Sequence, residues 1–173
     1  MTAFLPLDGL QIFDMSTFVA GPLCTLTLAQ LGAEVTRIDP SGGRADTRRW
    51  PLAPSGESLY WSNLNRGKDI IALDSSTQDG LRYLKRMIAD SGPDGGIIVS
   101  NAVGQPRLGY DELRTARSDL IHVLIQGKRD GSSAVDYTVN AECGIAEMTG
   151  PPSHLGPVNH VLPAWDIACG LHA

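Results

Sequence analysis

Short apolar runs alternate with stretches of helical periodicity along this chain. Runs such as LQIFD, EVTRID and GIIVSN are only a few residues long and end in a polar side chain, which is typical of buried strands. Longer stretches between them place apolar residues at helical spacing. Strands that alternate with helices pair in parallel through crossover connections. The pattern therefore predicts an α/β fold, a Rossmann-like parallel sheet with crossover helices.

The clearest expected helix covers residues 77–90. Leu81 and Ile88 fall on one face, and either Ser76 or Thr77 can cap the first turn. The sequence SGP follows at once, which is a strong signal for the end of a helix. This segment is expected to cover one face of the sheet.

Irregular polar stretches occupy residues 40–58 and 127–136. The loops that follow parallel strands gather at one edge of the sheet, so these two and the turn at 14–21 are expected to lie together there. The segment SGGRADTRR within 40–58 has the glycines and arginines of a phosphate-binding loop. It lacks the spacing of either common phosphate-binding motif, which favours an ordinary solvated loop.

Composition narrows the possible partners. The 173 residues carry a formal net charge of -5, without a block of like charges, which argues against nucleic acid and anionic membrane as partners. The histidines and the three cysteines have no metal-ligand spacing, and no apolar run reaches the ~18 residues that a membrane span needs. We expect a soluble cytoplasmic protein with no metal and no permanently bound cofactor.

Asp166 stands near the start of a helix that is expected after Pro163. Free N–H groups and the helix dipole favour an ionised carboxylate at such a position. On the residues alone, Asp166 is either an acid that stabilises its own helix or a carboxylate with a chemical role. Spacing does not pair it with Asp130 or Asp136, so the pattern by itself gives no mechanism.

Ordered sequence blocks along the whole chain resemble one enzyme family. PLDGLQIFDMSTFVAGPLCTLTLAQLGAEVTRIDP, LYWSNLNRGKDIIALD and LPAWDIACGLHA are similar, in that order, to segments of the type III CoA-transferases. That group includes formyl-CoA transferase, carnitine CoA-transferase and α-methylacyl-CoA racemase. The resemblance implies a large Rossmann-like domain that takes CoA as part of an acyl-CoA substrate.

The resemblance also implies roles for individual residues. Asp166 matches the catalytic aspartate, which forms an aspartyl-CoA thioester. Asp136 and Tyr137 match positions that orient the substrate, although Asp136 is equally well explained as a helix-capping acid. The residues that match CoA-contacting positions are Phe18, Val19, Ala20, Leu73, Asn101, Arg107, Gln126, Gly127 and Lys128. The segment before Arg107 is shorter than is usual in the family, and Lys128 departs from the family pattern at its position.

The blocks KRDGSSAVDYTVN and PVNHVLPAWDI resemble a particular branch of the family. That branch moves CoA within one molecule, from one carboxylate of mesaconate to the other, so an acyl-CoA and a small dicarboxylate are the implied substrates. The racemase branch is the enzymatic alternative. Its acid–base histidine would fall at Val135, which cannot accept a proton.

Members of the resembled family are more than twice as long as this chain. Residues 1–173 are therefore expected to be the N-terminal part of the CoA-binding domain, without the small domain and the C-terminal part. The resemblance further implies an interlocked homodimer for the complete protein. A non-catalytic CoA-binding fragment is the alternative for the chain as it stands.

Overall fold

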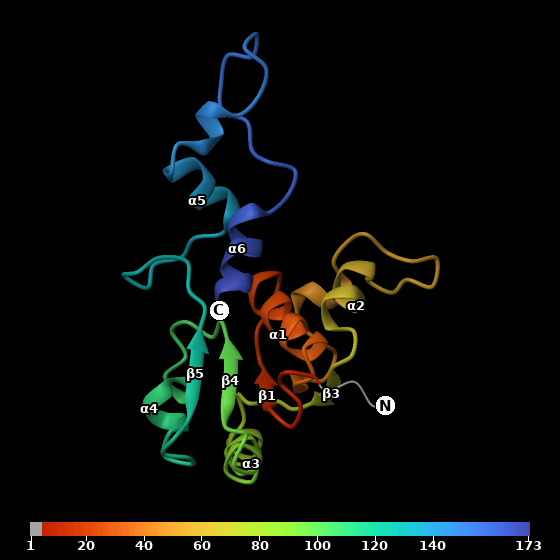
Figure 1. The fold of residues 1–173 in the computed structure, drawn as a ribbon, viewed down its shortest axis with the longest axis vertical. Helices are drawn as coiled ribbons and strands as arrows, with labels where there is room; N and C mark the ends of the chain where they lie inside the picture. The colour runs from red at the N-terminus through yellow and green to blue at the C-terminus, as the bar shows by residue number, and fades with distance from the viewer. Residues whose placement is uncertain (1–4) are drawn as a thin grey trace.

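The computed structural model describes residues 5–173 as a five-stranded parallel sheet with helices on both faces (Figure 1). The strand order is β3-β2-β1-β4-β5. The strands are β1 (Gln11–Asp14), β2 (Glu34–Asp39), β3 (Asp69–Ala72), β4 (Ile97–Ser100) and β5 (Ile121–Leu124). The predicted α/β class and Rossmann-like sheet are thus confirmed.

The helices lie between the strands and after the last one. The α-helices are α1 (Ala20–Gln30), α2 (Leu59–Asn65), α3 (Gln78–Ala89), α4 (Tyr110–Leu113), α5 (Asp136–Glu142) and α6 (Ala164–His172). Single 3₁₀ turns are η1 (Ala45–Arg48), η2 (Pro106–Leu108) and η3 (Ile145–Met148). None of the helices between residues 5 and 173 is long and apolar enough to cross a membrane.

Neighbouring residues of a strand pack on opposite faces of the sheet. Ile12 packs with Cys24 of α1 in one apolar cluster, whereas Phe13 packs with Leu84 and Ile88 of α3 in the other. Because side chains alternate along a strand, a parallel sheet covered on both faces needs such continuous apolar runs. Helix α3 begins and ends within one residue of the predicted span.

The first residues of α3 show how its start is fixed. The Thr77 side chain accepts a hydrogen bond from the Gly80 N–H at 3.0 Å, so Thr77 and not Ser76 is the cap. Leu81, Leu84 and Ile88 form its buried face, as the spacing predicted. The α4 region is shorter than a full crossover helix, and 3₁₀ turn η2 precedes it.

A buried carboxylate lies where β1 ends. Asp14 is completely buried and accepts hydrogen bonds from the Ser16 hydroxyl at 2.5 Å and the Thr25 hydroxyl at 2.6 Å. The Lys68 ammonium lies 2.9 Å from the same carboxylate, and Arg37 lies 3.5 Å away. Burial alone would raise the pKa of Asp14, but Lys68 and Arg37 hold it below its ordinary value.

Arg37 extends this network to the rest of the sheet edge. Its guanidinium is 0% exposed and donates to both carboxylate oxygens of Asp39, at 3.0 and 3.1 Å. It also donates to Asn65 at 3.3 Å and lies 3.7 Å from Asp46. These contacts join β1, β2, α2 and the 40–58 loop through one buried guanidinium, which pairs with carboxylates and with the neutral Asn65 amide.

The 40–58 loop differs from the expectation of an ordinary solvated loop. Its centre forms η1, and Asp46 within that turn is only 1% exposed. An isolated antiparallel bridge between Leu52 and Ser58 closes the far end. The loop is ordered because Asp46 and Arg44 reach buried or half-buried partners, which the sequence pattern did not indicate.

Helices α1 and α6 approach each other closely. A Cβ atom on Gly170 would lie 2.6 Å from the Ala20 carbonyl oxygen and 3.2 Å from the Leu23 Cβ. Only glycine fits at that crossing. Figure 1 shows α6 beside the start of α1, on the side to which all strands point.

Replacing Lys68 with Met tests the buried network. The variant removes the nearest cation from Asp14 and leaves a buried carboxylate with less compensation, so we expect a loss of about 3–5 kcal/mol in the free energy of unfolding. Urea denaturation measures it. In contrast, Arg82→Met removes a cation from an exposed pair with Asp79 and is expected to cost about 0.5 kcal/mol or less.

The loss in the free energy of unfolding of the Lys68→Met variant should also depend on pH. A depressed pKa means that Asp14 adds stability above its ordinary pKa, and that this stability is lost as the pH falls through the folded-state value. Without Lys68 the folded-state pKa of Asp14 rises, so the deficit should be largest near neutral pH and shrink in acid. A deficit that grows on acidification would contradict the assigned network.

Candidate active site

A large cavity opens at the carboxyl ends of the strands. Its volume is about 1100 Å³, and its walls come from the turn after β1, the 40–58 loop, the ends of β4 and β5, and helices α5 and α6. In the strand order, β1 is the point where the chain reverses direction across the sheet. Ligands of open α/β sheets bind at such a point. The three loops predicted to gather at this edge do so.

The turn after β1 has an unusual backbone. Phe18 has a φ of 66°, which is rare for a residue other than glycine. Its N–H donates to the buried Asp46 carboxylate at 2.9 Å, so the 40–58 loop holds this turn in place. Val19 then precedes α1 with no side-chain cap, which leaves N–H groups at the start of α1 pointing toward the cavity edge.

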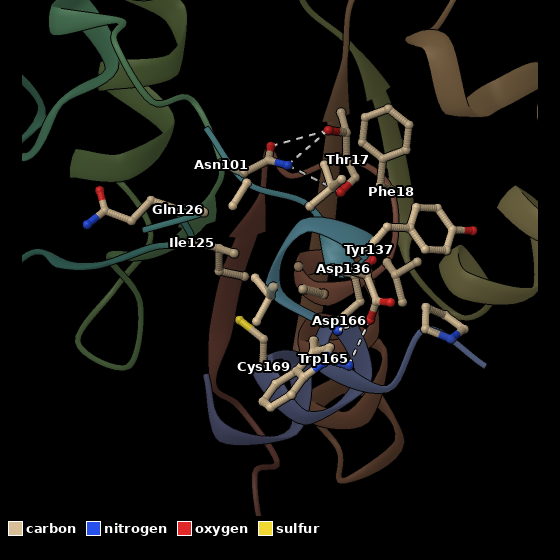
Figure 2. Close-up of a pocket in the computed structure, with 18 of the residues that line it drawn as sticks. Thr17, Phe18, Asn101, Ile125, Gln126, Asp136, Tyr137, Trp165, Asp166 and Cys169 are labelled. Carbon is tan, nitrogen blue, oxygen red and sulfur yellow. Dashed lines mark hydrogen bonds between the residues drawn. The ribbon is translucent and has the colours of Figure 1, made fainter. Parts of the chain in front are cut away.

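Asn101 connects the end of β4 to the same turn. Its amide nitrogen donates to the Thr17 hydroxyl at 3.0 Å and to the Thr17 carbonyl at 3.3 Å (Figure 2). The hydroxyl of Thr17 also lies 3.3 Å from the Asn101 amide oxygen. Asn101 therefore lines the cavity and fixes the shape of the turn.

Asp136 caps helix α6. One of its carboxylate oxygens accepts the N–H of Trp165 at 2.8 Å and the N–H of Asp166 at 3.2 Å (Figure 2). Asn140, one turn further along α5, accepts the Trp165 indole N–H at 3.2 Å. Helix α5 thus sets the position of the first turn of α6, which carries Asp166. Asp136 therefore caps α6 and not its own helix, and it does so as a buried side chain.

Asp166 is half-buried in the cavity wall. Burial raises the pKa of its carboxyl, the neighbouring Asp136 raises it further, and Arg49 opposes both. The free N–H groups of α6 that would stabilise a first-turn acid are already bonded to Asp136. An ionised Asp166 is therefore held at a cost, unlike a residue whose purpose is to stabilise its own helix.

Arg49 stacks on aromatic rings beside Asp166. Its guanidinium carbon lies 4.7 Å from the centre of the Tyr60 ring and 5.5 Å from that of Phe18. Burial raises the pKa of Tyr60 to about 12, so the phenol stays neutral at physiological pH. This arrangement places a positive charge in the cavity lining, close enough to Asp166 to lower the pKa of its carboxyl.

Most of the residues predicted from the resemblance meet at this cavity. Those that line it are Phe18, Val19, Ala20, Asn101, Gln126, Gly127, Asp136, Tyr137 and Asp166. Their roles in binding or catalysis stay predictions. Among the residues the structure describes, no cluster of three or more acidic, histidine or cysteine side chains is arranged to hold a metal ion.

Three predicted CoA contacts lie away from the cavity. Arg107 on η2 donates to the Ser76 carbonyl at 2.9 Å, and Lys128 pairs with Glu142 at 2.5 Å. Leu73 packs against the core cluster of α3. The residue before it, Ala72, lines a smaller cavity of about 260 Å³ at the ends of β2 and β3.

The sequence did not single out Arg49 and Tyr60. Arg49 ends the SGGRADTRR segment and Tyr60 lies in LYWSNLNRGKDIIALD, but neither pattern gave these residues a role, and they meet Asp166 only through the fold. The one available signal was the length of the 40–58 loop, because long ordered loops tend to carry function.

Comparison with known proteins agrees with this geometry. The chain is 48% identical to the 2-methylfumaryl-CoA isomerase of Chloroflexus aurantiacus over 95% of its own length and 40% of that protein. It is 31% identical to the human succinyl-CoA:glutarate CoA-transferase over 100% of its length and 41% of that protein. The chain thus spans about two fifths of the length of these relatives.

Solved structures and a family profile agree with these relatives. The crystal structure of a CAIB/BAIF family protein from Brucella suis superposes with a TM-score of 0.85 and 27% identity, over 98% of this chain and 47% of that one. The profile of CoA-transferase family III matches residues 7–173. With nearly every described residue inside that match, and Asp166 in the wall of the cavity at the strand ends, the chain belongs to CoA-transferase family III.

Proposed function

We propose that the full-length protein transfers CoA between carboxylates, with Asp166 as the nucleophile. One observation carries this proposal: Asp166 faces the cavity with a raised pKa, while Asp136 caps the helix that bears it. An ionised carboxylate that is more basic than usual is a better nucleophile than an ordinary one. Acids with perturbed pKa values in clefts are also typical of functional sites.

The first half of the reaction builds a covalent intermediate. The ionised Asp166 carboxylate attacks the carbonyl carbon of the acyl-CoA thioester, and the C–S bond breaks to give a mixed anhydride and a CoA thiolate. The thiolate then attacks the aspartyl carbonyl of the anhydride. The anhydride C–O bond breaks, which leaves an aspartyl-CoA thioester on Asp166 and a free carboxylate.

The second half reverses these steps on another carboxylate. That carboxylate attacks the aspartyl-CoA carbonyl and expels the thiolate, and the thiolate then attacks the acyl carbonyl of the new anhydride. The product thioester forms, and Asp166 is released as a carboxylate. No proton is gained or lost overall, so the site needs a positioned nucleophile and little general acid–base chemistry.

The cavity suits this chemistry because its intermediates react with water. Phe18, Val19 and the Tyr60 ring contribute apolar surface to the cavity lining, and burial of the reacting groups limits hydrolysis. The CoA moiety is proposed to lie along Phe18, Val19, Ala20 and Asn101 and near Gln126 and Gly127, with Leu73, Arg107 and Lys128 as outer contacts.

The substrate is proposed to be a dicarboxylic acyl-CoA. The relatives compared above are named for 2-methylfumaryl-CoA, succinyl-CoA and glutarate, which are all derived from dicarboxylic acids. Because the isomerase is the more similar of the two, we propose intramolecular transfer on mesaconyl-CoA as the specific reaction. Val135 lines the cavity next to Asp136 and cannot exchange a proton, which disfavours a racemase.

Replacing Asp166 with Asn should abolish turnover in the full-length protein. The amide keeps the size of the side chain but is no nucleophile, so CoA binding is expected to persist while thioester migration falls by at least about 1,000-fold. Wild-type mixtures treated with hydroxylamine should label the peptide that carries Asp166. The exposed Asp111→Asn variant serves as the control and should remain active and labelled. Near-normal turnover of Asp166→Asn would rule out this nucleophile.

Replacing Asp136 with Asn should shift the pH dependence of kcat/KM. The amide oxygen can still cap α6, but the negative charge that raises the pKa of Asp166 is gone. Since the nucleophile must be ionised, activity is lost as the pH falls through the pKa of Asp166, and the acidic limb should move to lower pH in the variant. The pH profiles of wild-type and variant test this, with Asp111→Asn as the reference. A shift to higher pH would contradict the assigned electrostatics.

Isotope labelling distinguishes intramolecular from intermolecular transfer. The full-length protein is given mesaconyl-CoA together with ¹³C-labelled free mesaconate, and the thioester position is followed by NMR. We expect the thioester to migrate between the two carboxylates with little label entering the CoA ester, because the released acid stays in the cavity. Rapid label incorporation would instead indicate an ordinary transferase.

A further inference from the structure

We propose that Arg49 binds the free carboxylate of the dicarboxylic acyl group, and so selects dicarboxylates and retains the acid released during transfer. This inference rests on the proposed CoA-transfer function. It assigns a specificity-determining role to the last residue of the SGGRADTRR segment, for which the sequence pattern favoured an ordinary solvated loop.

The charges of the cavity call for a cation at this place. Asp136 and Asp166 both line the cavity, and a dicarboxylate that enters it brings further negative charge. Among the lining residues between positions 5 and 173, Arg49 is the one lysine or arginine. Its charge already acts on Asp166, whose pKa it lowers against the effect of burial. Without Arg49 the free acid would be repelled from the cavity.

Arg49 is held in place without using up its charge. Its guanidinium stacks on Tyr60 and Phe18, and among the described side chains no carboxylate forms an ion pair with it. Tyr60 is neutral, so it supplies a platform and no counter-ion. A planar guanidinium stacked in this way keeps its N–H edge available, and that edge matches a carboxylate with paired hydrogen bonds.

The backbone of Arg49 is anchored from both sides. Its N–H donates to the Asp46 carbonyl at 3.1 Å, and its carbonyl accepts the Ser58 hydroxyl. Asp46 in turn accepts the Phe18 N–H and lies beside the buried Arg37. The buried ionic network therefore fixes Arg49 relative to the turn after β1.

The proposed chemistry gives this cation a purpose at a particular moment. Once the aspartyl-CoA thioester has formed, the acyl group is a free dianion with no covalent bond to the protein. Intramolecular transfer requires that the dianion reorients in the cavity and reacts through its other carboxylate before it escapes. A single positive charge that binds one carboxylate leaves the other free to attack the aspartyl-CoA thioester.

The test compares substrates with and without the second carboxylate in the full-length protein. The rate of aspartyl-CoA formation on Asp166 is measured by quenching, hydroxylamine treatment and peptide mass analysis, with mesaconyl-CoA and with the monocarboxylic crotonyl-CoA. Arg49→Met should slow the reaction of mesaconyl-CoA by about 10- to 100-fold, the range expected for a lost charged hydrogen bond. The crotonyl-CoA rate should change little. The fraction of labelled mesaconate that enters the CoA ester per turnover should rise.

Arg48→Met is the matched control, because Arg48 is the adjacent arginine, is exposed as Arg49 is, and does not line the cavity. It should leave both rates unchanged. Arg49→Lys keeps the charge without the planar fork, so a partial loss of selectivity is expected, and it replaces the Met variant if that variant fails to fold. Equal losses on both substrates, or no loss on either, would overturn the inference. If the wild-type protein forms no adduct on Asp166 with either substrate, the proposed function itself fails.

Discussion

The buried guanidinium of Arg37 is the interaction on which the rest of this structure depends. It is 0% exposed and is surrounded by the carboxylates of Asp14, Asp39 and Asp46. Removing such charges from water costs free energy, and a hydrophobic cluster of the same volume could be as stable. The ionic cluster instead fixes the relative positions of the segments that form it. Each of the three aspartates belongs to a different segment, and each must lie within a few ångströms of the same guanidinium.

Through that cluster the sheet determines where several residues of the cavity wall lie. Asp46 links Arg37 to the left-handed backbone of Phe18, and Arg49 directly follows the 3₁₀ turn that contains Asp46. In the part of the wall formed by α5 and α6, Asp136 fixes the first turn of α6. Arg49 and Asp166 are therefore each positioned through another carboxylate, Asp46 and Asp136 respectively.

The strands, the span of α3 and the helix that begins near Asp166 could be predicted from the sequence because they depend on local spacing. Apolar runs and the Thr77 cap leave a mark that is readable over a few residues. The contact between Asp136 and Asp166 could not be predicted in this way, since 30 positions separate them and only the packing of α5 against α6 joins them. For the same reason the role of Asp46 stayed hidden: a buried aspartate in a polar loop looks the same in sequence as a solvated one. The resemblance to a family supplied the expected role of Asp166, which its position alone left open.

The close crossing of α6 over α1 at Gly170 has a consequence for how such a protein can change over evolutionary time. Because a side chain at that position would collide with the Ala20 carbonyl, the helix that bears Asp166 and the start of α1 after the β1 turn pack together as one close block. Arg49 stands on a different segment, attached to that block through Asp46. Under the proposed function, mutations in the 40–58 loop would alter which acids are accepted while Asp166 stays where it is. Changes in substrate range would then arise in the 40–58 loop, and the chemistry proposed for Asp166 would be preserved.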